Sequence, residues 1–383
     1  MEKNKNIKLY LHIPFCVKKC AYCDFLSFPC MKKDDISSYA DALAKRIREK
    51  AKDFKDRTLD SVFIGGGTPS LLDEADFLKI SDAVFESFNP SGNLEFTLEA
   101  NPGTVNKSKL LSYIKGFVNR LSFGLQSTIK TELETIGRIH TYEDFLKSYE
   151  LAREVGVDNI NIDLMQALPY QTRESHEESL RRVLSLKPEH ISAYSLILEE
   201  NTPLFDIDKS LLPDEDTERL MYHDALDILS EYGYERYEIS NYAKPGFYCR
   251  HNIGYWECDD YLGLGLGASS LVDNVRFKET SDFSEFLSAP CERGFVDITK
   301  LSLEDRVEEF MFLGLRMTEG ISLVKFKERF NLDFLNVYKD VCKKHTENGL
   351  LEFYNDNKNI RLTKKGLDLA DYVMTDFMEP DIS

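Results

Sequence analysis

Three cysteines near the N-terminus are the residues of this chain best suited to metal chemistry. Cys16, Cys20 and Cys23 follow a short apolar run with the spacing Cys-x3-Cys-x2-Cys. Thiolates this close together pair poorly as disulfides, whereas soft sulfur ligands select iron–sulfur clusters, zinc or copper. A structural zinc site or an ordinary four-iron cluster takes four protein ligands, so a loop that offers three leaves one metal position open. The spacing therefore predicts a metal loop with a free coordination position.

Zinc is the alternative metal for this loop, with His12 or Cys30 as the fourth ligand. The three-cysteine spacing and its context favour the cluster. The chain has eight cysteines, and those outside the loop are scattered, which does not suggest a secreted disulfide scaffold. We therefore expect a reducing compartment, which suits a cluster that oxygen would damage.

Length and charge limit the class of protein. A chain of 383 residues with 42% hydrophobic residues can fill a sizeable core, and we expect one large domain plus a small one. Lys+Arg 48 against Asp+Glu 66 gives a net charge of −18 with no compact basic stripe, so we expect no nucleic acid as partner. No run of about eighteen apolar residues and no signal-peptide core is present. We expect a cytoplasmic protein.

The elements that must position the cysteine loop follow from the apolar pattern. Runs of strand length alternate with helical patterns, the first of which places Ile36, Leu43 and Ile47 on one face. The predicted strands are Lys8–Ile13, Ser61–Ile64, Leu94–Leu98, Arg120–Phe123, Asn159–Leu164 and His190–Leu196, and the later helices are Asp73–Phe88, Lys107–Lys115, Tyr142–Val155 and Arg173–Leu186. Strand–helix repeats predict an α/β fold with a parallel sheet and right-handed crossovers, curled into a partial (β/α)6 TIM-like barrel.

Polar residues stand at the end of each predicted strand. They are the cysteine loop, the run Gly65–Thr68, Glu99, Gln126, Asp163 and Tyr194. Each alone has a structural interpretation, such as a helix cap or a loop hydrogen bond. Because ligands of α/β barrels bind at the carboxyl ends of the strands, the set together predicts one binding mouth.

The cysteine loop resembles that of the radical S-adenosylmethionine (SAM) superfamily. In that superfamily three cysteines hold a [4Fe-4S] cluster, and the amino and carboxylate groups of SAM chelate the fourth iron. Tyr22, just before Cys23, fits the usual aromatic residue of the loop. The resemblance assigns the cluster to Cys16, Cys20 and Cys23. It implies SAM contacts for Tyr10, Tyr22, Gly66, Gly67, Thr68, Glu99, Gln126, Arg138 and Asp163.

Within the superfamily the chain is similar to the branch of oxygen-independent coproporphyrinogen III oxidases. Those oxidases carry a fourth cysteine where Phe25 stands, and a long N-terminal arm. The radical SAM haem chaperones of the branch share HIPFC-x2-KC-x-YCDF and a downstream CRHN-x2-YW box, and this chain has both; we call residues 249–256 the box. One departure is MQALP (residues 165–169), where relatives usually have an aromatic residue and a glycine before Leu-Pro.

The resemblance implies a haem chaperone that uses a [4Fe-4S] cluster and SAM to bind haem and pass it to an acceptor protein. The alternative is an enzyme, a coproporphyrinogen III oxidase or another radical SAM catalyst. Imidazole and thiolate can ligate haem iron, and aromatic rings can lie against a porphyrin. Cys249, His251, Tyr255 and Trp256 are therefore candidate haem contacts, although the structural alternative, in which His251 and Asn252 pin the following loop, is favoured for His251. The expected partners are haem, an unidentified acceptor and an electron donor such as a flavodoxin or ferredoxin, with weak membrane association through the acceptor left open.

After residue 300 the pattern changes. Amphipathic helices, a small hairpin and a last helix are predicted at Leu303–Met317, Leu323–Phe330, Phe334–Glu347, Gly349–Phe353 with Asn359–Leu362, and Thr363–Phe377. This order resembles a winged helix. The acidic balance favours a packing or lid role over DNA binding. We expect a radical SAM barrel over residues 1–240, a linking region with the box over 241–300 and a helical, winged-helix-like domain over 301–383.

Overall fold

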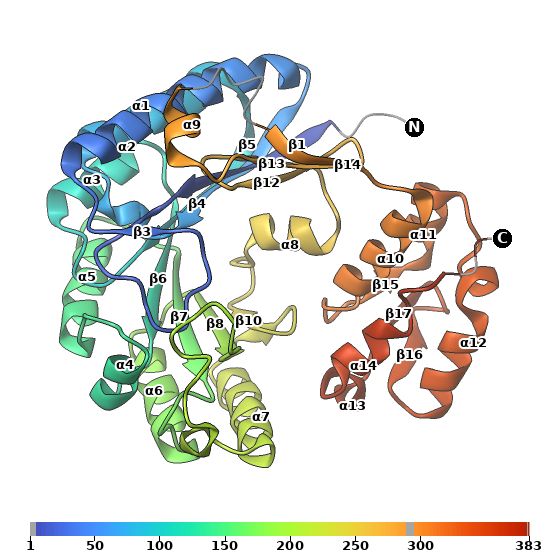
Figure 1. The fold of residues 1–383 in the computed structure, drawn as a ribbon. Coiled ribbons are helices and arrows are strands. Elements are labelled where there is room, and N and C mark those ends of the chain that lie inside the picture. The colour runs from blue at the N-terminus through green and yellow to red at the C-terminus, as the bar shows by residue number, and fades with distance from the viewer. Residues whose placement is uncertain (1–4, 289–294, 381, 383) are drawn as a thin grey trace.

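The computed structural model describes residues 5–288, 295–380 and 382, and its centre is a parallel sheet (Figure 1). The six predicted strands are all present and lie side by side in the order β1, β4, β5, β6, β7, β8. Their bounds are β1 (Asn6–Ile13), β4 (Thr58–Gly66), β5 (Asn89–Ala100), β6 (Arg120–Gln126), β7 (Ile160–Gln166) and β8 (His190–Ser195). Each pairs in parallel with the next, which confirms the predicted partial barrel.

Helices on the outer side of the sheet connect the strands (Figure 1). They are α1 (Lys33–Lys50), α2 (Glu74–Ser87), α3 (Lys107–Lys115), α4 (Lys130–Thr135), α5 (Tyr142–Glu154), α6 (Arg173–Ser185) and α7 (Glu215–Glu231), with short 3-10 turns at Ala51–Phe54, Pro69–Leu71 and Lys209–Leu211. Helix α1 buries Tyr39, Leu43 and Ile47 against the strands, the face that the sequence pattern predicts. Capping boxes at Thr141 and Thr172 fix where α5 and α6 begin. Helices α4 and α7 are present in the structure but are not among the helices predicted from the sequence.

The same sheet continues beyond both ends of the predicted barrel. Strand β11 (Tyr261–Leu264) pairs in parallel with β1 and is followed by β12 (Ser269–Val272), β13 (Val275–Glu279) and β14 (Phe295–Lys300). At the other end β10 (Asn241–Ala243) pairs antiparallel with β8, and β9 (Glu235–Arg236) with β10. Residues 241–300, which we expect to be a linking region, thus supply strands to the sheet. The division into three domains itself stays a prediction.

Three short elements lie beside the sheet. The pair β2 (Phe15–Cys16) and β3 (Phe28–Pro29) ties the two ends of the cysteine loop together. Helix α8 (Arg250–Trp256) contains most of the box and packs against β4 and, in the C-terminal region, α10. Helix α9 (Phe283–Ser288) packs on α1. Figure 1 shows α8 between the barrel strands and the C-terminal region.

The C-terminal region has its own apolar core, which includes Phe326, Tyr338 and Phe377. Its elements are α10 (Leu303–Gly314), β15 (Ile321–Ser322), α11 (Leu323–Phe330), α12 (Phe334–Glu347), β16 (Leu351–Tyr354), β17 (Asn359–Leu362), α13 (Lys364–Leu367) and α14 (Ala370–Thr375). Strands β15, β17 and β16 form a three-stranded sheet, so the helical, winged-helix-like fold is confirmed. None of the helices in the described ranges has the length and apolar character needed to cross a bilayer.

Two helix ends in this region differ from the predicted ones. Helix α10 ends at Gly314 instead of Met317, because the next residues leave the helix and dock on the barrel, where Met317 forms a β-bridge with Glu238. The last helix is divided into α13 and α14 at Leu369, whose φ of −123° and ψ of 31° are not helical.

Candidate functional site

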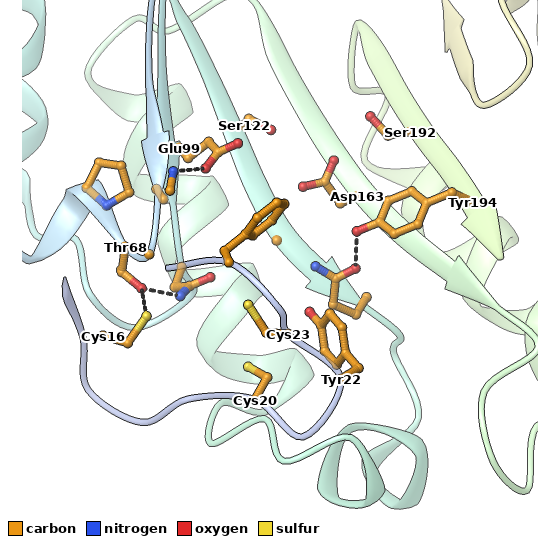
Figure 2. Close-up of a pocket in the computed structure, with 18 of the residues that line it drawn as sticks. Cys16, Cys20, Tyr22, Cys23, Thr68, Glu99, Ser122, Asp163, Ser192 and Tyr194 are labelled. Carbon is orange, nitrogen blue, oxygen red and sulfur yellow. Dashed lines mark hydrogen bonds between the residues drawn. The ribbon is translucent and has the colours of Figure 1, made fainter. Parts of the chain in front are cut away.

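The predicted mouth is a cavity of about 350 Å³ at the carboxyl ends of the strands. Figure 2 shows Cys16, Cys20 and Cys23 on the loop, with Glu99, Asp163 and Tyr194 reaching toward the same space from the strands. Of the residues implied as cluster or SAM contacts, all except Tyr10 line it. These are Cys16, Cys20, Tyr22, Cys23, Gly66, Gly67, Thr68, Glu99, Gln126, Arg138 and Asp163.

The cysteine sulfurs have polar neighbours on the cavity wall. Cys16, Cys20 and Cys23 are free thiols of intermediate exposure. Thr68 Oγ1 donates toward Cys16 Sγ over 3.6 Å, and Arg138 Nη1 toward Cys20 Sγ over 3.6 Å. Hydrogen bonds to sulfur ligands stabilise and tune iron–sulfur clusters. Three cavity-facing thiols with such donors fit a [4Fe-4S] cluster whose fourth iron has no protein ligand.

The two side chains that could complete a zinc site are engaged elsewhere. The ring nitrogens of His12 lie 2.9 Å from the Tyr10 hydroxyl and 2.9 Å from the Leu26 carbonyl oxygen. Cys30 is exposed, and its thiol donates to the Val17 carbonyl oxygen at 3.3 Å. Among the residues that the structure describes, no three cysteine, histidine or carboxylate side chains are arranged for a single metal ion. A four-iron cluster does not require that arrangement, because each thiolate binds a different iron.

The glycine run at the end of β4 packs against the start of the cysteine loop. Gly66 has a φ of +114°, and a Cβ there would lie 2.6 Å from the His12 ring. At Gly67 a Cβ would lie 2.7 Å from the carbonyl oxygen of Phe15, the residue before the first cysteine. Glycine is needed here so that the backbones can approach closely. With Thr68, both glycines also line the cavity, so a ligand there would meet exposed backbone.

Two carboxyl groups face the cavity from β5 and β7, the strands on either side of β6. Burial and, after it, the nearby Asp163 raise the pKa of Glu99 to about 8, although the Gly66 N–H donates to Glu99 Oε2 at 3.2 Å. Burial also raises the pKa of Asp163, which accepts a hydrogen bond from Asn161 at 2.8 Å. A ligand that brought a cation or hydroxyl donors between the two carboxylates would stabilise their charged forms. An amino group or a ribose suits this description.

Gln126 and Arg138 are held in fixed positions. Gln126 has a φ of +73°, a region that costs energy for a side chain other than glycine, and such strain concentrates at functional sites. Its side-chain oxygen accepts a hydrogen bond from Tyr194 at 3.0 Å. Arg138 donates to the Gly124 carbonyl oxygen at 2.5 Å and to Asn101 Oδ1 at 3.1 Å. The guanidinium is thus oriented before any ligand arrives.

The box is divided between different surroundings. Trp256 lines the mouth cavity, whereas Tyr255 and Tyr10 line a second cavity of about 350 Å³. Phe25, 67% exposed, lines both cavities and stands between them. Cys249 lines neither of the two cavities.

His251 and Cys249 are buried in the protein. The ring nitrogens of His251 lie 2.8 Å from the Ser61 hydroxyl and 2.9 Å from the Tyr255 hydroxyl. The Cys249 thiol lies 3.5 Å from a carboxylate oxygen of Glu95. Either side chain would have to leave these contacts to ligate a haem iron.

The sequence does not predict several of the residues that line the mouth cavity. Asn101, Ser122 and Ser192 line the mouth, as do Glu238 and Arg316. Asn101 stands two residues after Glu99, so its place at a strand end could have revealed it. Nothing in the local pattern marks Arg316, which lies in a predicted helix far along the chain and reaches the mouth only through the tertiary fold.

Comparisons with known proteins identify relatives of this chain. A profile of the Radical SAM superfamily matches residues 10–183, and one of the HemN C-terminal domain matches residues 301–369. The chain is 36% identical to a heme chaperone HemW from Lactococcus lactis, over 98% of each chain. It is 33% identical to the HemW of Escherichia coli, over 92% of this chain and 93% of the relative.

A solved structure supports the fold. Coproporphyrinogen III oxidase (HemN) from Escherichia coli, described as a radical SAM enzyme, superimposes with a TM-score of 0.85 at 23% identity, over 98% of this chain and 90% of that one. This likeness concerns architecture. The near full-length identity to the curated relatives goes further, and on that ground the chain belongs to the heme chaperone HemW family of radical SAM proteins.

Proposed function

We propose that this protein is a haem chaperone that binds haem and transfers it to an acceptor protein, with a [4Fe-4S] cluster and SAM as cofactors. The observation that carries the proposal is the 36% identity to a heme chaperone over 98% of both chains. Phe25, in place of the fourth cysteine of the oxidases, favours the same assignment.

In this proposal Cys16, Cys20 and Cys23 hold the cluster. Glu99 and Asp163 take the amino and hydroxyl donors of SAM, which lower their pKa values on binding. Arg138 keeps its orientation through Asn101 and Gly124. The remaining proposed SAM contacts are Tyr10, Tyr22, Gly66, Gly67, Thr68 and Gln126. When bound and reduced, such a cluster would supply the electron that cleaves SAM. If SAM stays intact, its binding would instead tune the charge of the cluster.

Haem is the cargo in this proposal. Trp256, at the wall of the mouth cavity, and Tyr255, at the second cavity, offer flat aromatic surfaces to a porphyrin. Cys249 and His251 remain candidate contacts, but their protein partners favour a role in holding the box. The acceptor is unidentified, and the electron donor would be a flavodoxin or ferredoxin. A cytoplasmic location is part of the proposal.

The experiment compares two activities of the same anaerobically reconstituted protein. Haem titration and transfer to an apo-haemoprotein, followed by absorbance, should show binding and release. Incubation with dithionite, SAM and coproporphyrinogen III should give no protoporphyrinogen. Formation of protoporphyrinogen would instead assign the chain to the oxidases, and failure to bind haem would remove the proposal.

A further inference from the structure

Three polar side chains from distant parts of the chain meet at the mouth cavity, where the barrel adjoins the C-terminal region. Glu238 follows β9, Trp256 ends α8 and Arg316 follows α10. Arg316 Nη2 lies 3.6 Å from Glu238 Oε2, and the guanidinium carbon lies 4.5 Å from the centre of the Trp256 ring. We call these three residues the Arg316 wall.

Each member of the Arg316 wall has a buried polar atom without a hydrogen-bond partner. The atoms are Glu238 Oε2, Trp256 Nε1 and Arg316 Nε, and Glu238 is fully buried. A buried polar atom left unpaired destabilises the folded protein, so native proteins contain few of them. Glu238 Oε2 faces the Arg316 guanidinium at 3.6 Å, whereas the N–H groups at Trp256 Nε1 and Arg316 Nε have no acceptor. Two unpaired donors on neighbouring side chains that line one cavity indicate that an acceptor group of a ligand completes the wall.

The backbone holds the wall in place before a ligand binds. Met317 forms an antiparallel bridge with Glu238, and the Thr318 N–H donates to the Tyr237 carbonyl oxygen at 3.0 Å. Glu238 Oε1 accepts hydrogen bonds from the Ser240 N–H at 2.9 Å and from Asn241 Nδ2 at 2.6 Å. The other oxygen, Oε2, is thereby left facing the guanidinium. A wall fixed in this way loses little entropy when it binds a ligand.

The free groups define the chemistry of the ligand. Arg316 Nε–H and Trp256 Nε1–H are donors beside a positive charge, and their natural complement is a carboxylate. Glu238, bound on its other oxygen, orients the guanidinium. We propose that the Arg316 wall binds a carboxylate of the ligand and that this group is a propionate of haem. The propionate assignment rests on the proposed function, in which the other available carboxylate, that of SAM, chelates iron.

The test uses two variants that keep the wall's shape. R316K keeps a positive charge opposite Glu238 but loses the planar set of N–H donors. W256F keeps an aromatic ring but loses the N–H. Iron protoporphyrin IX and its dimethyl ester are titrated against the reconstituted full-length protein in the same detergent. R306K is the matched control, since Arg306 lies in α10, also has an unpaired buried Nε, and lies outside the mouth cavity.

We expect R316K and W256F each to weaken binding of iron protoporphyrin IX by about tenfold or more, because each variant loses an N–H donor to a charged carboxylate. Both variants should bind the dimethyl ester as the unchanged protein does, and R306K should behave as the unchanged protein with both ligands. If R316K does not fold, W256F alone decides.

The outcomes separate this inference from the proposed function. If the unchanged protein binds no haem, the proposed function fails. If it binds haem and both variants bind haem equally well, the Arg316 wall is not a carboxylate site and the proposed function stands. If instead the variants lose SAM affinity in equilibrium dialysis while haem affinity is unchanged, the carboxylate belongs to SAM and the propionate assignment is overturned.

Discussion

The cysteine loop and the box both carry cysteine beside other metal-ligating side chains, yet the fold treats them in opposite ways. The loop sulfurs are partly exposed and face a cavity. In the box Cys249 is fully buried and His251 almost so, with the His251 ring held at both nitrogens. Burial raises the pKa of Cys249 to about 12 and lowers that of His251 to about 3. Both are thereby kept neutral and within the protein.

The difference teaches that the partners of a side chain decide its role more than its type does. Burial also raises the pKa of Cys23 in the loop, but there a bound iron can replace the proton, because the thiol faces open space. No such exchange is open to Cys249, whose surroundings are protein. We therefore read the loop as a ligand set and the buried half of the box as a structural clamp.

Cysteine substitutions should have the largest effect, and they test directly whether the loop and the box differ in binding metal. C16A, C20A and C23A should each lower iron and sulfide content after anaerobic reconstitution by more than about tenfold, because each removes the thiolate that would bind one iron. C249A should retain the iron of the unchanged protein. The measurement is iron and sulfide analysis with the absorption spectrum. Equal iron loss in C249A would show that the box, too, supplies a ligand.

The clamp depends on Glu95, a buried carboxylate on β5. It accepts the N–H groups of Arg250 at 2.9 Å and His251 at 3.0 Å, at the start of α8. E95Q should lower stability by about 2–3 kcal/mol, because an amide group would face two N–H donors in place of a charge. The control is E86Q at an exposed ion pair with Arg48, where we expect about 0.5 kcal/mol or less. Thermal unfolding of the two variants measures this, and equal midpoints would argue against the clamp.

These contacts also explain what the sequence could predict. The cysteine spacing and the strand-end residues are local features, so the loop, the six parallel strands and most of the mouth could be read from them. The partnership of Glu95 with the box joins residues more than a hundred positions apart. Strand β11 pairs with β1 across an even larger separation in sequence, and its four residues carry no alternating pattern of their own. Arg316 reaches the mouth only because α10 stops at Gly314 and its next turn docks on Tyr237.

The pH dependence of stability sharpens the assignment of His251 to the clamp. Its pKa is lowered by burial to about 3 in the folded protein, against 6.5 for an ordinary histidine. Between pH 3 and pH 6.5, His251 therefore binds a proton in the unfolded chain but not in the folded protein. The folded state loses stability as the pH falls from 6.5 toward 3. Within this window His251 should contribute about 1.4 kcal/mol per pH unit.

H251Q should remove that contribution from the slope of unfolding free energy against pH, measured by chemical denaturation between about pH 6 and pH 4.5. His140 and His176, whose pKa values are both lowered by burial to about 4, will maintain part of the slope in the variant. An unchanged slope would mean that His251 is charged or exposed in the folded protein. The Soret band of bound haem should be the same in H251Q, since the ring is occupied by Ser61 and Tyr255.

The smallest effect concerns backbone strain beside the cysteine loop. Ala167, just after β7, has a φ of +59°. Met165 and Leu168, which flank it, belong to an apolar cluster against which Tyr22 of the loop packs, so the strain lies beside the cysteine loop. A167G should stabilise the protein by about 0.5–1 kcal/mol, because relief of the left-handed conformation exceeds the added entropy of the unfolded glycine. A193G, at a buried position of β8 without positive φ, should destabilise it instead. The measurement is the thermal midpoint of each variant, together with the iron content of A167G. Midpoints that move in these opposite directions, with unchanged iron, would show that the strain belongs to the scaffold and not to cluster binding. A lower midpoint for A167G would mean that the neighbouring packing requires the methyl group.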